Sequence, residues 1–194
     1  EALASENTKS GGIYKGVMVG SSGFFTVVLQ KGIKEVRLTM DGESKSLATT
    51  ALPDWTSGEP IKNALFVSGD WQATFSVGVT GGAPSITIDI PGHPGAQTVI
   101  TKELSTDVVR VFEGTFVGTE SGTWNFVIQG PVLSGISRTA DGSGSLAFVG
   151  LVNGTTIVLN TLIGDGTISG DNVSGTWEDT NSGGSGTWTG KRIL

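Results

Sequence analysis

One pair of β-strands, which occurs twice in the chain, decides the fold. Residues 14–30 read YKGVMVGSSGFFTVVLQ, and residues 112–129 read FEGTFVGTESGTWNFVIQ, with one extra residue in the second turn. The first residues of the two stretches correspond, and Phe25 corresponds to Trp124. Because residues two apart share one face of a strand, the alternation predicts that these aromatic side chains point inward in two equivalent hairpins.

The match resumes after the hairpins. Asp-Gly pairs follow at residues 41–42 and 141–142, between runs rich in β-forming residues. Asp-Gly supplies the positive φ angles of a tight two-residue turn, so each pair predicts a further hairpin. We therefore expect residues 13–50 and 111–150 to superpose as equivalent pairs of hairpins.

The remaining sequence is also typical of β-structure. Apolar residues alternate from Trp71 to Val79 and again from Ile86 to Ile90, and nowhere does a helical period last. The pattern predicts about 14 strands and less than about a tenth of the residues in helix. The expected fold is all-β and antiparallel, with two related β-barrel or β-sandwich halves.

The repeat also predicts the domain organisation. We expect a flexible polar N-terminal tail over residues 1–12, a first β repeat over 13–103 and a second over 111–192, joined near residues 104–109. A single closed barrel of about 14 strands would have a wide lumen, which favours two packed subdomains. The sequence leaves open whether the halves share one core.

Composition excludes several classes of partner. The 194 residues include 31 glycines and no cysteine, and the formal net charge is −6. Phosphate binding requires a basic stripe, which the sequence lacks, so we expect no nucleic-acid partner. There is no run of 18 apolar residues, so we expect no membrane span. The oligomeric state cannot be read from the sequence.

The residue inventory argues against most enzyme chemistry. The one histidine, His93, lies between two Pro-Gly pairs, and no cysteine is present to act as a nucleophile or metal ligand. Glu103, Glu113 and Glu120 supply carboxylates, which alone can cleave a glycosidic bond. We expect no catalytic residues, no metal site and no cofactor, with carboxylate chemistry as the surviving alternative.

The five tryptophans are the remaining candidates for a site. The tetrapeptide Ser-Gly-Thr-Trp ends at Trp124, Trp177 and Trp188, and we expect its glycine to start a strand and its Thr and Trp to occupy opposite faces. Trp71 and Trp124 lie in alternating strands and are interpreted as core. We assign candidate ligand-binding roles to Trp55, which lies in a loop, and to Trp177 and Trp188.

A family resemblance supports a barrel. Gly122-Thr-Trp-Asn-Phe-Val-Ile-Gln-Gly-Pro-Val-Leu-Ser-Gly135 resembles the first-strand pattern of avidin- and lipocalin-like (calycin-type) β-barrels, as Gly175-Thr-Trp177 does more faintly. Residues 112–192 resemble the Gly/Thr/Trp-rich β repeats of uncharacterised bacterial exported proteins and lipoproteins. The resemblance implies a barrel with an interior. No ligand-binding residue of avidin-like proteins has a counterpart in this sequence.

Three functions stay open at this stage. The first is an exported, non-catalytic binding protein that holds a lipid-like or other apolar small molecule in an aliphatic interior. The second is a structural or adhesive cell-surface module that binds carbohydrate, with a glycan as its partner. The third is a carboxylate-dependent glycoside hydrolase. The Ser/Thr/Gly/Asn-rich composition and the family resemblance predict a secreted, periplasmic or cell-surface location in a bacterium, with the export signal absent from this chain.

Overall fold

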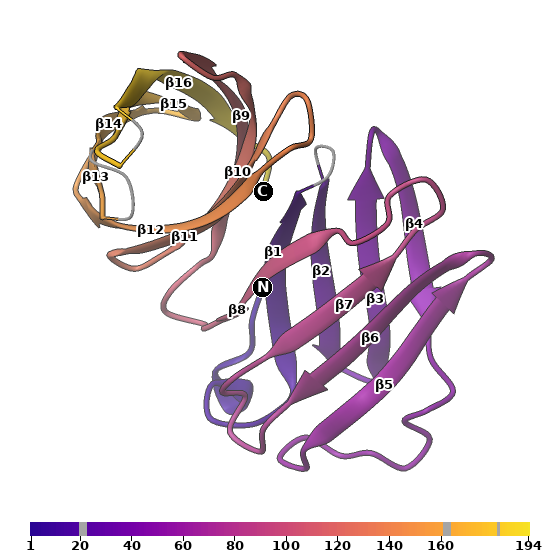
Figure 1. Cartoon of the computed structure of the whole chain (residues 1–194). Helices are drawn as coiled ribbons and strands as arrows, with labels where there is room; N and C mark the ends of the chain where they lie inside the picture. The colour runs from indigo at the N-terminus through magenta and orange to yellow at the C-terminus, as the bar shows by residue number, and fades with distance from the viewer. Residues whose placement is uncertain (20–22, 161–163, 182) are drawn as a thin grey trace.

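The protein is all-β and antiparallel, and it consists of two related eight-stranded halves (Figure 1). The computed structural model describes residues 1–19, 23–160, 164–181 and 183–194. Within these residues there are 16 strands, two more than expected, and one three-residue 3₁₀ helix at Ala4–Glu6. The predictions of an antiparallel fold, of very low helix content and of two β halves are confirmed.

The first half is a sheet in the order β7-β6-β5-β4-β3-β2-β1-β8. Its strands are β1 (Gly12–Val19), β2 (Gly23–Gln30), β3 (Ile33–Met40), β4 (Glu43–Ala48), β5 (Ile61–Ser68), β6 (Trp71–Val77), β7 (Ser85–Asp89) and β8 (Gln97–Glu103). The sheet curls so that β5–β7 lie across β1–β3 (Figure 1). The hydroxyl of Thr98 donates to the carbonyl oxygen of Ile86 at 2.8 Å, which links the two edge strands.

The interior of this half is filled with large side chains. Tyr14, Phe25, Phe66 and Phe75 are fully buried, and the Tyr14 and Phe75 rings meet edge to face with centroids 5.2 Å apart. Strand β6 ends two residues earlier than the alternation predicted, because Val79 lies in a turn and is half exposed. The first half therefore has a packed core.

The N-terminal segment contacts the first half. Residues 1–12, for which the sequence predicts a flexible tail, contain the short 3₁₀ helix Ala4–Glu6 and reach the first half through hydrogen bonds. The ammonium group of Lys102 donates to the carbonyl oxygens of Glu6 (2.6 Å) and Lys9. Burial lowers the pKa of this ammonium group. A sequence pattern does not reveal a lysine nearly a hundred residues away that donates to these carbonyl groups.

The second half is a closed barrel in which each strand pairs with the next and the last pairs with the first, in the order β10-β11-β12-β13-β14-β15-β16-β9. Its strands are β9 (Arg110–Gly118), β10 (Gly122–Gln129), β11 (Val132–Thr139), β12 (Ser145–Asn153), β13 (Thr156–Leu159), β14 (Gly164–Ser169), β15 (Asn172–Asp179) and β16 (Gly184–Arg192). Figure 1 looks down its axis. This closed meander agrees with the barrel that the family resemblance implied.

The internal repeat is structural. Gly16 pairs with Phe25 across β1 and β2, and Gly114 pairs with Trp124 across β9 and β10. Both aromatic side chains are buried and face inward, as the alternation predicted. The matched hairpins thus start each half in the same way.

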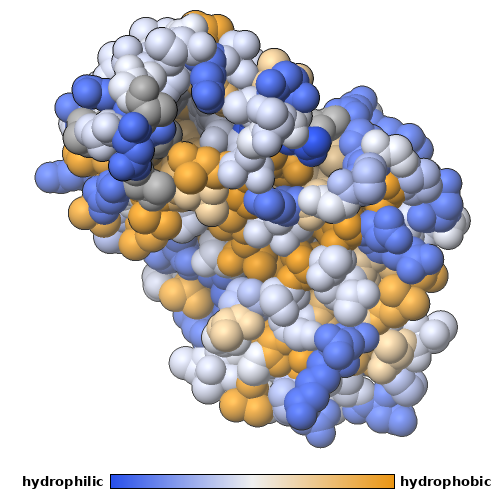
Figure 2. Space-filling model, in the orientation of Figure 1, coloured by the Kyte–Doolittle hydropathy of each residue, from blue (hydrophilic) through white to orange (hydrophobic). Residues whose placement is uncertain are grey.

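The halves meet at a small apolar interface. Val17 of β1 packs with Val109, Val111 and Val127, and apolar side chains continue across this junction on the face shown in Figure 2. Asn125 is buried within the same contact and donates its amide N–H to the carbonyl oxygen of Met18 at 2.6 Å. Gln129 makes two further hydrogen bonds across the junction, to the hydroxyl of Thr101 and to the carbonyl oxygen of Lys102. Dispersion and apolar burial, supplemented by these hydrogen bonds, therefore hold the two halves together.

The interface gives a first prediction. Val111→Ala removes two buried methyl groups from the contact between the halves and should lower the free energy of unfolding by about 2 kcal/mol. Val117→Ala is the matched control, because Val117 lies on the same strand and is half exposed; it should change stability by less than about 0.5 kcal/mol. Urea denaturation measures both, and equal effects would show that the interface contributes nothing.

Candidate functional site

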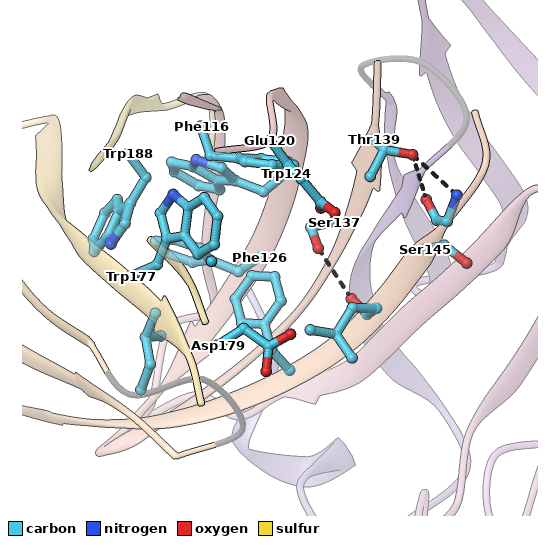
Figure 3. A pocket seen from close by; sticks show the side chains of 15 residues that line it. Phe116, Glu120, Trp124, Phe126, Ser137, Thr139, Ser145, Trp177, Asp179 and Trp188 are labelled. Carbon is cyan, nitrogen blue, oxygen red and sulfur yellow. Dashed lines mark hydrogen bonds between the residues drawn. The ribbon is translucent and has the colours of Figure 1, made fainter. Parts of the chain in front are cut away.

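A cavity of about 290 Å³ occupies one end of the second barrel (Figure 3). It lies at the end where β9–β10, β11–β12, β13–β14 and β15–β16 are connected. Its lining residues are Phe116, Glu120, Trp124, Phe126, Ser137, Thr139, Gly144, Ser145, Leu146, Phe148, Leu159, Trp177, Asp179, Gly184 and Trp188. The interior of an eight-stranded barrel is just wide enough either to be filled by side chains or to hold one small ligand.

The difference between the two ends of the barrel comes from residue size. At the far end, inward positions carry aliphatic side chains that pack together, such as Ile128, Leu133 and Ile157. At the cavity end, the inward positions of β11 carry the small residues Ser137 and Thr139, which line the cavity together with large aromatic rings from other strands. These small side chains leave a gap beside the rings, and that gap is the cavity.

The aromatic wall has a fixed geometry. The rings of Trp124 and Phe126 are stacked, with centroids 4.6 Å apart and planes 8° apart. Trp188 meets Trp124 edge to face at 5.6 Å, and Phe116 meets Trp177 in the same manner at 5.9 Å. Offset stacking and edge-to-face contacts are the favourable arrangements for aromatic quadrupoles, so the rings hold one another in place.

Inward-facing glycines make room for these rings. A Cβ built on Gly166 or Gly175 would lie 2.2–2.5 Å from the ring of Trp188, and one on Gly114 would lie 2.2 Å from the ring of Trp124. Such distances are far inside van der Waals contact, so only glycine fits. Each tryptophan therefore lies flat across the bare backbone of a neighbouring strand.

This geometry corrects our interpretation of the Ser-Gly-Thr-Trp repeat. Thr and Trp do occupy opposite faces, but only Gly122 starts a strand. Gly175 and Gly186 lie within β15 and β16 and face inward. A Cβ on Gly175 would meet the ring of Trp188, and one on Gly186 would lie 2.7 Å from Nε1 of Trp177. The glycine of the repeat leaves space for the tryptophan ring of the neighbouring strand.

The indole N–H groups differ in their pairing. Trp124 donates to the carbonyl oxygen of Thr115 at 3.1 Å, and Trp188 donates to that of Thr176 at 3.0 Å. The Nε1 of Trp177 is buried and has no acceptor among the described residues. An unpaired buried donor costs roughly 1–3 kcal/mol, which makes Trp177 the least satisfied residue of the wall.

The mouth is polar and acidic. Glu120 and Asp179 line it together with the hydroxyls of Thr139 and Ser145. Next to it, in the β11–β12 turn, hydrogen bonds from the backbone N–H of Ser143 and from nearby hydroxyls lower the pKa of Asp141 to about 2. Because this pKa is depressed on folding, the contribution of Asp141 to turn stability is complete above its unfolded value and disappears as the pH falls through about 2.

The structure brings together only two of the tryptophans we singled out. Trp177 and Trp188 both line the cavity. Trp55 lies in the first half, packs against its core and donates its N–H to the carbonyl oxygen of Glu59 at 3.0 Å. Trp124, which we interpreted as core, is buried and also lines the cavity. The lining is mainly aromatic, whereas we expected an aliphatic interior.

The carboxylates considered for catalysis lie in three different places. Glu103 is buried beside Lys15 and accepts the backbone N–H of Val109 at 3.1 Å. Glu113 does not line the cavity and lies 3.6 Å from Lys191, and only Glu120 reaches the cavity mouth. Among these three residues there is thus no convergent pair.

The histidine and the possible metal-ligating side chains do not form a site either. His93 lies in the first half, with its Nε2 3.5 Å from the carboxylate of Asp41. Within the described part of the chain, no three His, Asp or Glu side chains gather into a group that could hold a metal ion. No helix among those residues is long and apolar enough to cross a membrane.

Comparisons with known proteins place the chain near two solved structures. No protein-family model matches the sequence, and no curated protein matches it. One structure, described as a surface lipoprotein, is 8% identical with a TM-score of 0.38, covering 93% of this chain and 98% of the other. The other, a mutant of the vaccine antigen transferrin-binding protein B from Actinobacillus pleuropneumoniae, is 9% identical with a TM-score of 0.39, covering 93% and 99%.

The glycine–tryptophan contacts give a second prediction. Gly166→Ala places a methyl group inside the ring of Trp188 and should lower the free energy of unfolding by about 1–3 kcal/mol. In Gly144→Ala, the matched control, the nearest atom to the new methyl group is 3.8 Å away, in Thr139. The control should change stability by less than about 0.5 kcal/mol in thermal unfolding. If both variants are equally stable, the rings do not depend on bare backbone.

Proposed function

We propose that the second half binds a small apolar ligand, without chemical turnover, in the cavity of its barrel. The observation that supports this proposal is the aromatic-lined space of about 290 Å³ at one end of a barrel whose other end is packed. Ligand sites are concave, mostly apolar and fitted with a few polar groups, and their volumes start near 300 Å³. This cavity has that character at the small end of the range.

The lining also bounds the affinity. A ligand with the apolar surface of one aromatic side chain buries about 200 Å². At 25 cal/mol per Å², that burial contributes about 5 kcal/mol. Because 4.1 kcal/mol corresponds to a dissociation constant of 1 mM, this burial alone corresponds to about 0.2 mM, and the cost of association brings the expected value to about the millimolar range. Probes for this site should therefore be tested at up to millimolar concentration.

We further propose that the protein works outside the cytoplasm, in the periplasm or at the cell surface of a bacterium. The support for this location is the Ser/Thr/Gly/Asn-rich β composition, together with the resemblance of residues 112–192 to β repeats of bacterial exported proteins. A binding protein in that setting meets ligands released into the medium.

A third prediction tests where the ligand binds. Five indole N–H signals are expected in a ¹H–¹⁵N spectrum, one for each tryptophan. Titration with the neutral probe 1-naphthylmethanol should shift the signals of Trp124, Trp177 and Trp188, which line the cavity. The signals of Trp55 and Trp71 should not move, because both residues belong to the first half. Shifts confined to those two would place the ligand elsewhere.

A fourth prediction tests the cavity by filling it. Ser137→Trp puts a large side chain into the space and should weaken binding of the same probe by tenfold or more, measured by fluorescence titration. Ser174→Trp is the matched control, because Ser174 is exposed on the outer face of β15; it should bind as the unaltered protein does. Circular dichroism checks that both variants fold, and unchanged affinity in a folded Ser137→Trp variant would refute the site.

A further inference from the structure

We infer that the ligand of this cavity is an apolar amine, with its positive charge held at the mouth and its apolar body against the aromatic wall. The inference rests on the proposed function and deepens it, because it names the chemical class that the cavity selects. Three observations carry it: the charges that line the mouth, the electrostatic character of the surrounding rim, and the apolar aromatic wall behind them.

Both charged side chains that line the cavity are carboxylates. Glu120 comes from the β9–β10 connection and Asp179 from the end of β15, so the two approach the mouth from different strands (Figure 3). Glu120 is exposed and makes no ion pair within the described residues. Asp179 is half-buried and accepts the backbone N–H of Asn181 at 2.9 Å, which fixes its orientation.

The rim strengthens the negative character of the mouth. Asp141, Asp165 and Glu178 lie at the same end of the barrel, in the β11–β12 turn, near the start of β14 and near the end of β15. At this end, the one basic residue of the second half is Arg138. It lines the groove that faces Pro94 and Gln97 of the first half and does not line the cavity.

The other basic residues of the second half are remote from the mouth. Arg110 starts β9, and Lys191 and Arg192 end β16, so all three lie at the packed end of the barrel. Lys191 is further occupied by the carboxylate of Glu113, 3.6 Å away. A mouth with clustered carboxylates and displaced cations concentrates positively charged solutes and repels anions.

The aromatic wall accommodates the apolar body of the ligand and not its charge. The ring of Trp124 stacks on that of Phe126 and lies against Gly114, and the ring of Trp188 lies against Gly166 and Gly175. Among the described residues of the second half, no lysine or arginine covers any of the rings that line the cavity. The carboxylates at the mouth are therefore the groups that would hold the positive charge of an amine.

The same features disfavour a fatty acid. A carboxylate head group at the mouth would lie beside Glu120 and Asp179, and like charges at close range repel. The hydroxyls of Ser137, Thr139 and Ser145 also line the cavity, and they do not supply a positive charge. Between amphiphiles of equal apolar size, the cavity should therefore prefer the amine over the acid.

The test uses three probes that share one naphthalene ring and differ in charge. These are 1-naphthylmethylamine (cationic at pH 7), 1-naphthylmethanol (neutral) and 1-naphthoic acid (anionic). At low ionic strength we expect the amine to bind at least tenfold more tightly than the acid, with the alcohol between them, in fluorescence or calorimetric titrations of the full chain. Raising the salt concentration to about 0.5 M should reduce this preference through screening.

Two double variants assign the preference to its cause. Glu120→Gln with Asp179→Asn preserves shape and hydrogen-bonding capacity, and it should reduce the amine-to-acid preference to threefold or less. Asp165→Asn with Glu178→Gln removes the same amount of charge from the rim at two residues that do not line the cavity, and it should keep most of the preference.

The outcomes separate this inference from the proposed function. Binding of the alcohol without any preference for the amine, or a preference that survives Glu120→Gln with Asp179→Asn, would overturn the inference and leave apolar binding intact. Failure of all three probes to bind at millimolar concentration would overturn the proposed function itself. An equal loss of preference in the two double variants would show that the overall charge acts, and not the two lining carboxylates.

Discussion

The second half of this protein depends on one kind of contact, a tryptophan ring that lies across inward-facing glycines of the next strand and of the strand beyond it. Trp124 covers Gly114 and Gly190, and Trp188 covers Gly166 and Gly175. Because each ring occupies the space of a missing side chain, it lies against the barrel wall instead of crossing the interior. That arrangement keeps the aromatic side of the barrel thin, and the small residues of β11 leave the remaining space open. The cavity, its lining and its shape all follow from this contact.

The first half uses the same device at one position and reaches a different result. The ring of Phe25 lies over Gly16, as the ring of Trp124 lies over Gly114. However, the first sheet curls back so that β5–β7 pack onto β1–β3, and residues such as Phe66 and Phe75 fill its interior. The repeated hairpin is therefore a shared starting point, and the strands that follow it decide whether the half is solid or hollow.

The features that could be predicted from sequence are those carried by neighbouring residues. The pairing of Gly16 with Phe25 and of Gly114 with Trp124 is local to a hairpin, so alternation and turn residues were sufficient. The cavity was not predictable in this way, because it depends on the summed volumes of side chains from strands far apart in the chain. Trp124 shows the limit clearly: its alternation indicated a buried position, but not that its ring borders an open space. Trp55 shows the converse, since its loop position did not reveal that its ring packs on a core.

The order of the strands has a consequence for how the chain reaches its native state. In each half the final strand pairs with the initial one, β8 with β1 and β16 with β9. Neither half can complete its hydrogen-bonded ladder until its eighth strand is present, so two long loops must close and their entropy must be lost late. Before that moment, β1 and β9 each expose an unpaired edge of similar sequence pattern. The later strands of the two halves differ in sequence, so β1 pairs with β8 and β9 pairs with β16. This difference limits the exchange of strands between the two halves during synthesis.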